Sequence, residues 1–531
     1  RPVVVPPLST SEIGFGFEKL ALDPKNELTI DGSAVGFNNM DELNIRNLIT
    51  KPAYLGALNW GQSSGEGTIL GGLVVSPNQM AQVDTAQYTP HSMVFPSPLA
   101  YVGQMFAAWR GDIILDIDIV ASKYHKGRLA LIWDPAGTST TNLINTDKFN
   151  VVKREIIDIG ETKSISIRIP YLQVTEWLNN GTMPSSTGLK SGTPTFSHNP
   201  AYDNGTFVIR VINELSAPVT SASVNILIYV RAAENFEFAN PRILDQTIGA
   251  GGSFGGLSLL APQSDDMTEL QFDQPSRPKE ERFLTNYGEA YVSLRPLLHR
   301  ISYVGTNSAG LTQAKINAIT YLMGPMPAAY GYDSNGQSSA LSITGGAASN
   351  FNFTMCHPMT WVAACFLARR GGTNWLFNPI CNSAQGTFPI NDLTISRLPF
   401  SQTTPFSGVV ASTPADNSAW ASYYRIYQYN GNAGTSFTDT RVQPTLAITA
   451  PDYNRYFFHG TSPLSATSFS QTDGSDFNVL SIKYTVDLSD VSTTNIVTHL
   501  TTFAGAGVDW TVHGFLHCPP VYIYNSYPTA N

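Results

Sequence analysis

Short runs of alternating apolar and polar residues recur along most of the chain and predict β-strands with one buried face. Each run is bounded by Gly, Pro, Asn or Asp. Many such strands without crossover helices between them indicate an antiparallel sandwich or barrel rather than an α/β fold. The runs are YVGQMFAAW, IILDIDIVAS, GRLALIWDP, KSISIRIPYL, TFVIRVINEL, SVNILIYVRAA, YVSLRPLLHRISYVG, AITYLMG, TWVAACFLARR, DLTISRLPF, SYYRIYQY, PTLAITAP, VLSIKYTVDL, NIVTHLTTF and WTVHGFLHCPPVYIY.

Three segments depart from this strand pattern. The first 27 residues form an irregular arm, and DELNIRNLITK at 41–51 predicts a short helix with Asp41 as its N-cap. The stretch between 245 and 282 is Gly-rich, then acidic, then rich in Pro and charge, which is typical of a linker. The predicted organisation is an arm at 1–27, a first domain at 28–245, a linker at 246–282 and a second domain at 283–531.

The two predicted domains share a motif. FAAWRGDIILDI at 106–117 aligns with FLARRGGTNWLF at 366–377, which predicts a duplicated fold with Arg-Gly as a tight turn into a strand. In the first copy, Arg110, Gly111 and Asp112 also form the tripeptide that integrin receptors bind. The second copy has Gly372 in place of the aspartate. The sequence therefore favours a structural role for this tripeptide over receptor binding.

The amino-acid composition indicates that the protein binds other subunits. The chain has 531 residues, of which 42% are hydrophobic, so it is long enough for more than one core. Charged residues make up only 13%, and a surface so poor in charge is expected to be buried against other subunits. The net charge is −9, and neither end carries a run of Lys or Arg. This argues against an arm that binds nucleic acid through charge alone.

The cysteines indicate a reducing compartment. Cys356, Cys365, Cys381 and Cys518 form no C-x-x-C pair and have no zinc-finger spacing, so buried thiols are expected. No apolar run approaches the roughly 20 residues of a membrane helix. The chain begins with Arg1 rather than Met, and we expect it to be processed from a longer precursor. No motif predicts a cofactor.

Apparent catalytic and ligand-binding motifs have simpler explanations. GQSSG at 61–65 matches Gly-x-Ser-x-Gly, but no helical pattern follows Ser63, as a nucleophile elbow requires. GAGGSFGG lacks the spacing of a phosphate-binding loop. His513 and His517 share a strand face without a third ligand nearby in sequence, so packed histidines rather than a metal site are expected. Three glycosylation sequons are expected to stay unmodified in the cytoplasm; they begin at Asn180, Asn204 and Asn352.

Two other function classes remain open on the residues alone. A secreted β-sandwich adhesin or lectin would more often carry paired cysteines or clustered calcium ligands, and the sequence has neither. A hydrolase would need polar residues gathered at a cleft, which the sequence does not define.

Several longer phrases resemble the capsid proteins of picorna-like viruses (Picornavirales), especially those of insects and of marine algae. They occur in the family order and together cover most of the chain. The phrases are SLRPLLHR at 293–300, the two Phe-x-x-x-Arg-Gly turns, YHKGRLALIWDP at 124–135, APDYNRYFF at 450–458 and GAGVDWTVHGFLHCPPV at 505–521.

This resemblance implies an all-β protein of two eight-stranded antiparallel jelly-roll sandwiches in tandem, like the adjacent capsid proteins VP3 and VP1. It implies a structural, non-enzymatic role in a pseudo-T=3 icosahedral shell around a positive-strand RNA genome. The implied location is the virion, with assembly in the host cytoplasm. The implied partners are further copies of the chain, a third, VP2-like jelly-roll protein and a small internal VP4-like peptide. The implied partners also include genomic RNA, bound through weak non-specific contact, and a host receptor of unknown identity.

The resemblance also suggests two processing sites. Cysteine proteases of such viruses favour Gln before a small residue, which makes Gln263–Ser264 the candidate junction between two mature proteins. In related insect viruses an Asp-Asp-Phe triplet is thought to assist release of the internal peptide. Here Val508, Asp509 and Trp510 stand at that place. Asp509 is therefore either a general base, with its pKa raised by Trp510, or the cap of a turn after Gly507.

Overall fold

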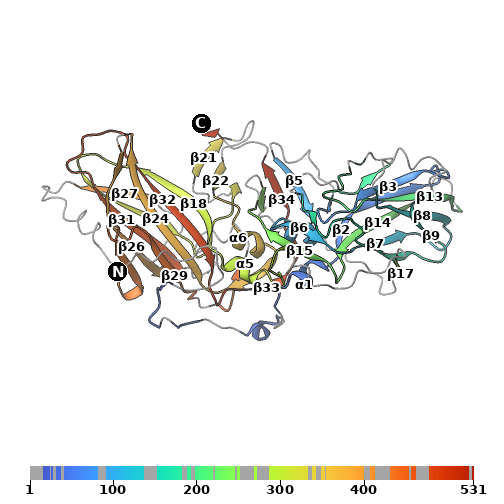
Figure 1. The fold of residues 1–531 in the computed structure, drawn as a ribbon, viewed down its shortest axis with the longest axis horizontal. Helices are drawn as coiled ribbons and strands as arrows, with labels where there is room; N and C mark the ends of the chain where they lie inside the picture. Colours follow the sequence, from blue (N-terminus) through green and yellow to red (C-terminus); the bar gives the residue numbers. More distant parts are fainter. Residues whose placement is uncertain are drawn as a thin grey trace.

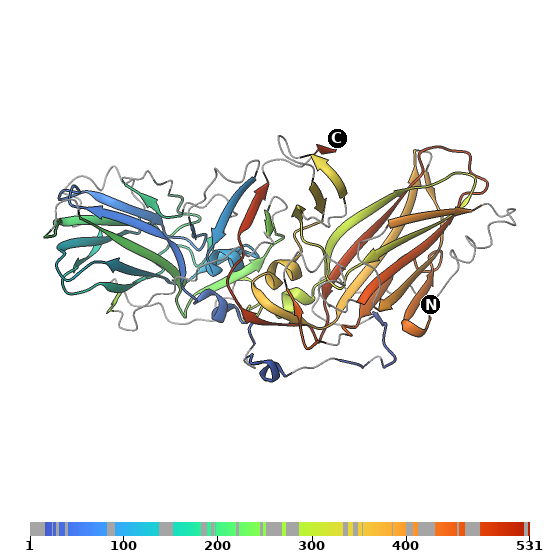
Figure 2. The same ribbon diagram turned by 180° about the vertical axis from the view of Figure 1, so that it is seen from behind.

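The chain folds into two β-sandwiches at opposite ends of an elongated molecule, with short helices between them (Figure 1 and Figure 2). We call residues 43–250 the first half and residues 286–530 the second half. The computed structural model describes residues 16–23, 25–27, 31–37, 41–81, 91–136, 152–181, 188–192, 196, 198–218, 222–244, 248–250, 268–271, 286–332, 338–342, 349–352, 354–384, 386–399, 407–412, 431–453, 456–461, 478–524 and 529–530.

Two five-stranded sheets form the sandwich of the first half. One has the order β17-β10-β7-β14-β2 and the other the order β12-β3-β13-β8-β9. The strands are β2 (Ala53–Gly61), β3 (Ile69–Val74), β7 (Ile113–Val120), β8 (Lys126–Asp134), β9 (Lys153–Asp158), β10 (Ser164–Ile169), β12 (Lys190–Ser191), β13 (Thr206–Ser216), β14 (Ser223–Ala232) and β17 (Thr268–Gln271).

The second half repeats this arrangement. Its sheets have the orders β1-β29-β24-β32-β18, with β25 beside β24, and β27-β19-β31-β26-β28. The strands are β1 (Glu18–Lys19), β18 (Ser302–Gly310), β19 (Ile316–Met323), β24 (Thr373–Ser383), β25 (Gly386–Phe388), β26 (Ile390–Pro399), β27 (Ser407–Ser412), β28 (Thr435–Asp439), β29 (Leu446–Ala450), β31 (Asn478–Asp487) and β32 (Val497–Ala506).

The main strands of each half follow one pairing order. The eight main strands are β2, β3, β7, β8, β9, β10, β13 and β14 in the first half and β18, β19, β24, β26, β28, β29, β31 and β32 in the second. Counted in this order, strands six, three, eight and one form one sheet of each half, and strands two, seven, four and five form the other. This is the order of a jelly roll, in which two Greek keys fold against each other. The prediction of an all-β fold with jelly-roll topology is therefore confirmed.

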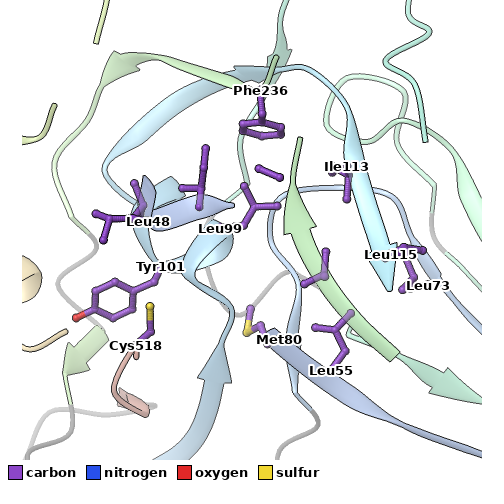
Figure 3. Close-up of a cluster of buried hydrophobic side chains, with 14 of the residues drawn as sticks. Leu48, Leu55, Leu73, Met80, Leu99, Tyr101, Ile113, Leu115, Phe236 and Cys518 are labelled. Atoms are coloured by element: carbon purple, nitrogen blue, oxygen red, sulfur yellow. The ribbon is translucent and has the colours of Figure 1, made fainter. Parts of the chain in front are cut away.

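Apolar side chains of alternate strand positions fill the sandwiches. On β7, Ile113, Leu115 and Ile117 face the first core, as the period of two predicts. A separate core lies between the sheets of the second half and includes Trp375 and Tyr484. The first core does not end with the first half, because it continues into the region of the helices between the sandwiches (Figure 3).

The predictions for the helices and the linker require correction. The predicted helix at 41–51 is shorter, at α1 (Ile45–Ile49), and its N-cap is Asn44. Asp41 instead accepts a bond from the backbone N–H of Leu43. Three predicted strands overlap short helices, each with proline in its first turn; these are α2 (Pro98–Gly103), α5 (Arg295–His299) and α6 (Pro358–Ala363). The predicted arm and linker contain the strands β1, β17 and β16 (Ile248–Ala250).

Candidate assembly interface between the two halves

Two short helices, one from each half, bring the halves together. Tyr101 is the fourth residue of α2 and Trp361 is the fourth residue of α6. Their rings stack with centroids 4.0 Å apart and an interplanar angle of 6°, and each side chain is only 1% exposed. Tyr101 Oη donates to the carbonyl of Trp361 at 2.7 Å, and Trp361 Nε1 donates to the carbonyl of Tyr101 at 3.2 Å. The contact is reciprocal, as across a two-fold axis.

The stacked pair lines a small apolar pocket together with residues of both halves. These are Leu48, Val102 and Met105 of the first half and Leu294, Val362 and Phe515 of the second. Cys365 and Cys518 also line it, with their sulfur atoms 3.9 Å apart. Cys518 lies beside Tyr101 in Figure 3. Burial raises the pKa of Tyr101 and of the Cys518 thiol. Both groups are therefore protonated and act in packing rather than as nucleophiles.

Backbone pairing extends the contact on both sides of the helices. The N–H of Ile45 donates to the carbonyl of Val292, and the N–H of Leu294 donates to that of Leu43, both at 3.0 Å. Strand β34 (Val521–Tyr524) of the second half pairs with β16 and with β5 (His91–Pro96) of the first. The halves thus share backbone ladders as well as a core.

The segment before the first sandwich runs along the second half instead of its own (Figure 1). We call residues 16–42 the first arm. Leu20 is 3% exposed and belongs to the core of the second half, whereas Leu22 is fully exposed. Asn26 Nδ2 donates to Tyr453 Oη at 2.9 Å. In the sequence, the apolar residues of the arm indicate only weakly that the arm docks on the second half, because no neighbouring residue identifies the surface that they contact.

The last anchors of the first arm lie beside the end of the second half. Phe37 stacks on His513 with a centroid separation of 5.5 Å and meets Phe458 edge-on at 5.4 Å. The Glu42 carboxylate accepts hydrogen bonds from the N–H groups of Gly514 and Phe515, each at 3.0 Å. His513 is therefore a packing residue for the arm. Burial lowers its pKa, and the nearby Glu42 opposes that shift.

The repeated Arg-Gly motif forms the same turn in both halves. It joins β6 (Phe106–Arg110) to β7 and β23 (Phe366–Arg370) to β24. Gly111 has φ 116° and Gly371 has φ 117°. A Cβ atom at either position would lie 2.4 Å from a backbone Cα, that of Phe236 or that of Trp510. Glycine is therefore required both for its φ and for this close approach.

We expect Gly371→Ala to destabilise the protein by about 2–3 kcal/mol more than Gly386→Ala, because only the first alanine overlaps a backbone elsewhere in the chain, that of Asp509 and Trp510 in the turn after β32. Gly386 has φ 138°, and a Cβ there would meet nothing within 4 Å, which makes it a matched control for the φ effect. Chemical denaturation of both variants measures the difference. Equal losses would contradict the close-approach argument.

Arg110, Gly111 and Asp112 do not form an exposed loop. Arg110 Nε donates to Glu237 at 2.7 Å, and its guanidinium lies 4.5 Å from the centroid of the Trp177 ring. Asp112 is 3% exposed, and its carboxylate accepts from Arg168 Nε and from the N–H of Tyr171, both at 2.8 Å. A receptor that binds the Asp112 carboxylate would have to break these hydrogen bonds, so the geometry favours the structural role.

Asp509 lies beside the second Arg-Gly turn. Its Oδ1 accepts a hydrogen bond from the N–H of Gly372 at 2.9 Å. In the first half, Asn235 Oδ1 accepts from the N–H of Asp112 at 3.3 Å in the same way. The equivalence favours the turn-capping interpretation of Asp509. Its neighbour Trp510 is buried in the core shared by the halves.

The remaining candidate residues are dispersed. Gln263 and Ser264 lie outside the residues that the structure describes. Ser63 lies in a turn that leads from β2 toward β3, without a following helix. Within the described residues there is no group of three His, Cys, Asp or Glu that could hold a metal ion. Among the same residues, no helix is long and apolar enough to cross a membrane.

Known proteins similar to this chain are viral structural and genome polyproteins, although no model of a protein family matches it. The structural polyprotein of cricket paralysis virus is 25% identical over 224 residues, which are 42% of this chain and 24% of that protein. The structural polyprotein of acute bee paralysis virus is 25% identical over 333 residues, 54% of this chain and 36% of that protein. The genome polyprotein of deformed wing virus is 23% identical over 241 residues, 43% of this chain and 8% of that protein. The chain thus spans well under half the length of these relatives.

Solved virus structures are also similar. The structure of a marine algae virus of the order Picornavirales is 27% identical with a TM-score of 0.40, over 46% of this chain and 92% of that chain. The Triatoma virus empty capsid is 19% identical with a TM-score of 0.38, over 52% of this chain and 97% of that one. From the sequence matches, this chain is related to the structural polyproteins of picorna-like viruses, as its motifs predicted.

Proposed function

We propose that this chain is a structural capsid protein that forms an icosahedral shell around a positive-strand RNA genome. The observation that carries the proposal is the jelly-roll strand order, found in a chain related to viral structural polyproteins. Its low charge fits the same role, because much of the surface would be covered by neighbouring subunits. The role is structural rather than enzymatic, and the protein belongs to the virion, assembled in the host cytoplasm.

We further propose two capsid domains, at 28–245 and 283–531, that correspond to VP3 and VP1. The repeated strand order and the repeated Arg-Gly turn support this division. The shell would also contain a VP2-like jelly-roll protein and a small internal peptide, and its RNA contacts would be weak and non-specific, since the chain is acidic overall. A host receptor would be bound elsewhere than at Asp112.

Co-expression of this chain with the rest of its structural polyprotein tests the capsid role. Sedimentation analysis and electron microscopy are expected to find closed particles of megadalton mass. Material that stays monomeric when the third jelly-roll protein is present would contradict a capsid protein and would favour an adhesin or a hydrolase.

Cleavage at Gln263–Ser264 is a separate proposal with its own measurement. We expect the intact-mass spectrum of mature particles to contain two products in place of the 57.6 kDa chain. A Gln263→Ala precursor should retain the full mass under the same conditions. Wild-type particles that contain only the uncut species would exclude this junction.

The proposed role of Asp509 in release of the internal peptide is tested best by Asp509→Asn. Asn235 caps the equivalent turn in the first half, so asparagine is expected to preserve the bond to Gly372 while it removes the charge. Assembly should then proceed normally and peptide release should slow by about 10²-fold or more, as for loss of a general base. Release at the normal rate would refute the catalytic role.

A further inference from the structure

Two of the four cysteines meet at the contact between the halves. The sulfur atoms of Cys365 and Cys518 lie 3.9 Å apart, although the residues are 153 positions apart in the chain. Both side chains are buried, and both line the apolar pocket beside Tyr101 and Trp361. We propose that these two thiols are a site of oxidation to a disulfide, which forms after the protein leaves a reducing compartment and stabilises the contact between the halves.

The backbone already holds the two cysteines close together. The N–H of Leu516 donates to the carbonyl of Cys365 at 2.9 Å. This bond continues the antiparallel pairing of β23 with β33 (Thr511–Phe515), and Cys518 follows Leu516 in the same segment. A disulfide has an S–S distance of about 2 Å, so the sulfur atoms must approach each other by about 2 Å. Side-chain rotation can supply this movement, because the pocket leaves space beside both cysteines.

The oxidation balances with a peroxide as the oxidant. The thiolate of Cys365 attacks one oxygen of hydrogen peroxide, the O–O bond breaks, and the released hydroxide takes the proton of this thiol and leaves as water. The sulfur of Cys518 then displaces the hydroxyl group of the sulfenic acid at Cys365, and its own proton completes a second water. Cys518 packs in the core until this step and becomes a nucleophile only when the sulfur beside it has been oxidised.

The disulfide would connect two elements that both contact the first half. Cys365 follows α6, which carries Trp361 against Tyr101. Cys518 lies beside Tyr101 and leads to β34, which pairs with β5 and β16 (Figure 3). A bond between the two cysteines closes a long loop and restrains the unfolded chain. Oxidation should therefore stabilise the contact between α2 and α6, whereas a reducing cytoplasm keeps the thiols free during assembly.

Peroxide treatment of the native full-length chain tests the proposal. After treatment, the remaining thiols are alkylated under denaturing conditions, and the intact mass and the chymotryptic peptides are measured. Chymotrypsin cleaves at Trp361 and so separates Cys356 from Cys365. We expect one link, between Cys365 and Cys518, and two alkylated cysteines. The linked chain should melt about 5 °C above the reduced chain, and dithiothreitol should remove the difference.

Single variants separate this site from the other thiols. Cys356→Ala and Cys381→Ala should retain the link and the higher melting temperature, whereas Cys365→Ala and Cys518→Ala should lose both. The peptide map of the wild-type chain decides the linkage even where a variant folds poorly. A native chain that forms no disulfide, or that links through Cys356, through Cys381 or to a second chain, would overturn the site.

A Cys365–Cys518 link without a rise in melting temperature would overturn its role at the contact between the halves. Only the timing of the oxidation, after assembly in the cytoplasm, rests on the proposed capsid function. The measurements use the unassembled chain, so they succeed or fail without any shell.

Discussion

Replacement of Trp361 by alanine is expected to lower the free energy of unfolding by about 3–5 kcal/mol, the range for a large aromatic side chain lost from a packed core. The change removes the stack on Tyr101 and the bond from Trp361 Nε1 to the Tyr101 carbonyl. It also leaves a void in the core that both halves share. Urea denaturation followed by tryptophan fluorescence and far-ultraviolet circular dichroism measures the loss.

Two further variants separate the causes. Trp361→Phe keeps an aromatic ring against Tyr101 and loses the indole bond, so a loss near 1–3 kcal/mol is expected. Val174→Ala removes an exposed side chain and should change stability by no more than about 0.5 kcal/mol. If Trp361→Ala behaves like the surface variant, the contact between α2 and α6 contributes little to holding the halves together.

The strands were predictable because their signal is local. IILDIDIV alternates with a period of two, and the structure contains that run as β7 with Ile113, Ile117 and Ile119 in the core. The Arg-Gly turn was predictable from its repetition, since the same close approach of backbone demands glycine in both halves. Short strands with one buried face can be predicted from their own sequence, because apolar and polar positions alternate along them.

The sequences of the helices α2 and α6 show no such periodic pattern. All six residues of α2 are buried, so no polar face marks a helical period. Proline at the first position and the caps from Ser97 and His357 were the available signals. In the sequence, an apolar run that fits a strand follows each of these signals. The strand prediction therefore includes residues that form the helix.

The interface between the halves could not be predicted at all. Tyr101 and Trp361 are 260 positions apart, and Glu42 is 472 positions from Gly514. Such pairings depend on how two finished sandwiches meet, which no local period encodes. The turn beside Asp509 could be predicted in part. The glycines around it suggested a cap, but its bond partner Gly372 lies 137 positions away.

Acidification is expected to destabilise the second half through His357. This residue is buried, and its ring bonds fix one neutral tautomer, because Nδ1 accepts from the N–H of Met359 and Nε2 lies 3.0 Å from the carbonyl of Ala504. Protonation of Nδ1 would break the cap of α6. Burial is the main cause that lowers the pKa of His357 from 6.5 to about 4. Burial also lowers the pKa of His299, which acts in the same direction.

The sign of the pH effect follows from proton binding. Between pH 6.5 and about 4 the unfolded chain binds a proton at His357 that the folded chain excludes, so stability falls as the pH falls through this window. The full difference in pKa corresponds to about 3 kcal/mol, all of it present as a loss below pH 4. Comparison with His357→Asn isolates this contribution, because asparagine can cap α6 but does not titrate. Denaturation curves at pH 7 and pH 4 should show the wild type losing about 3 kcal/mol more than the variant. Parallel losses in the two proteins would show that His357 is not the group responsible.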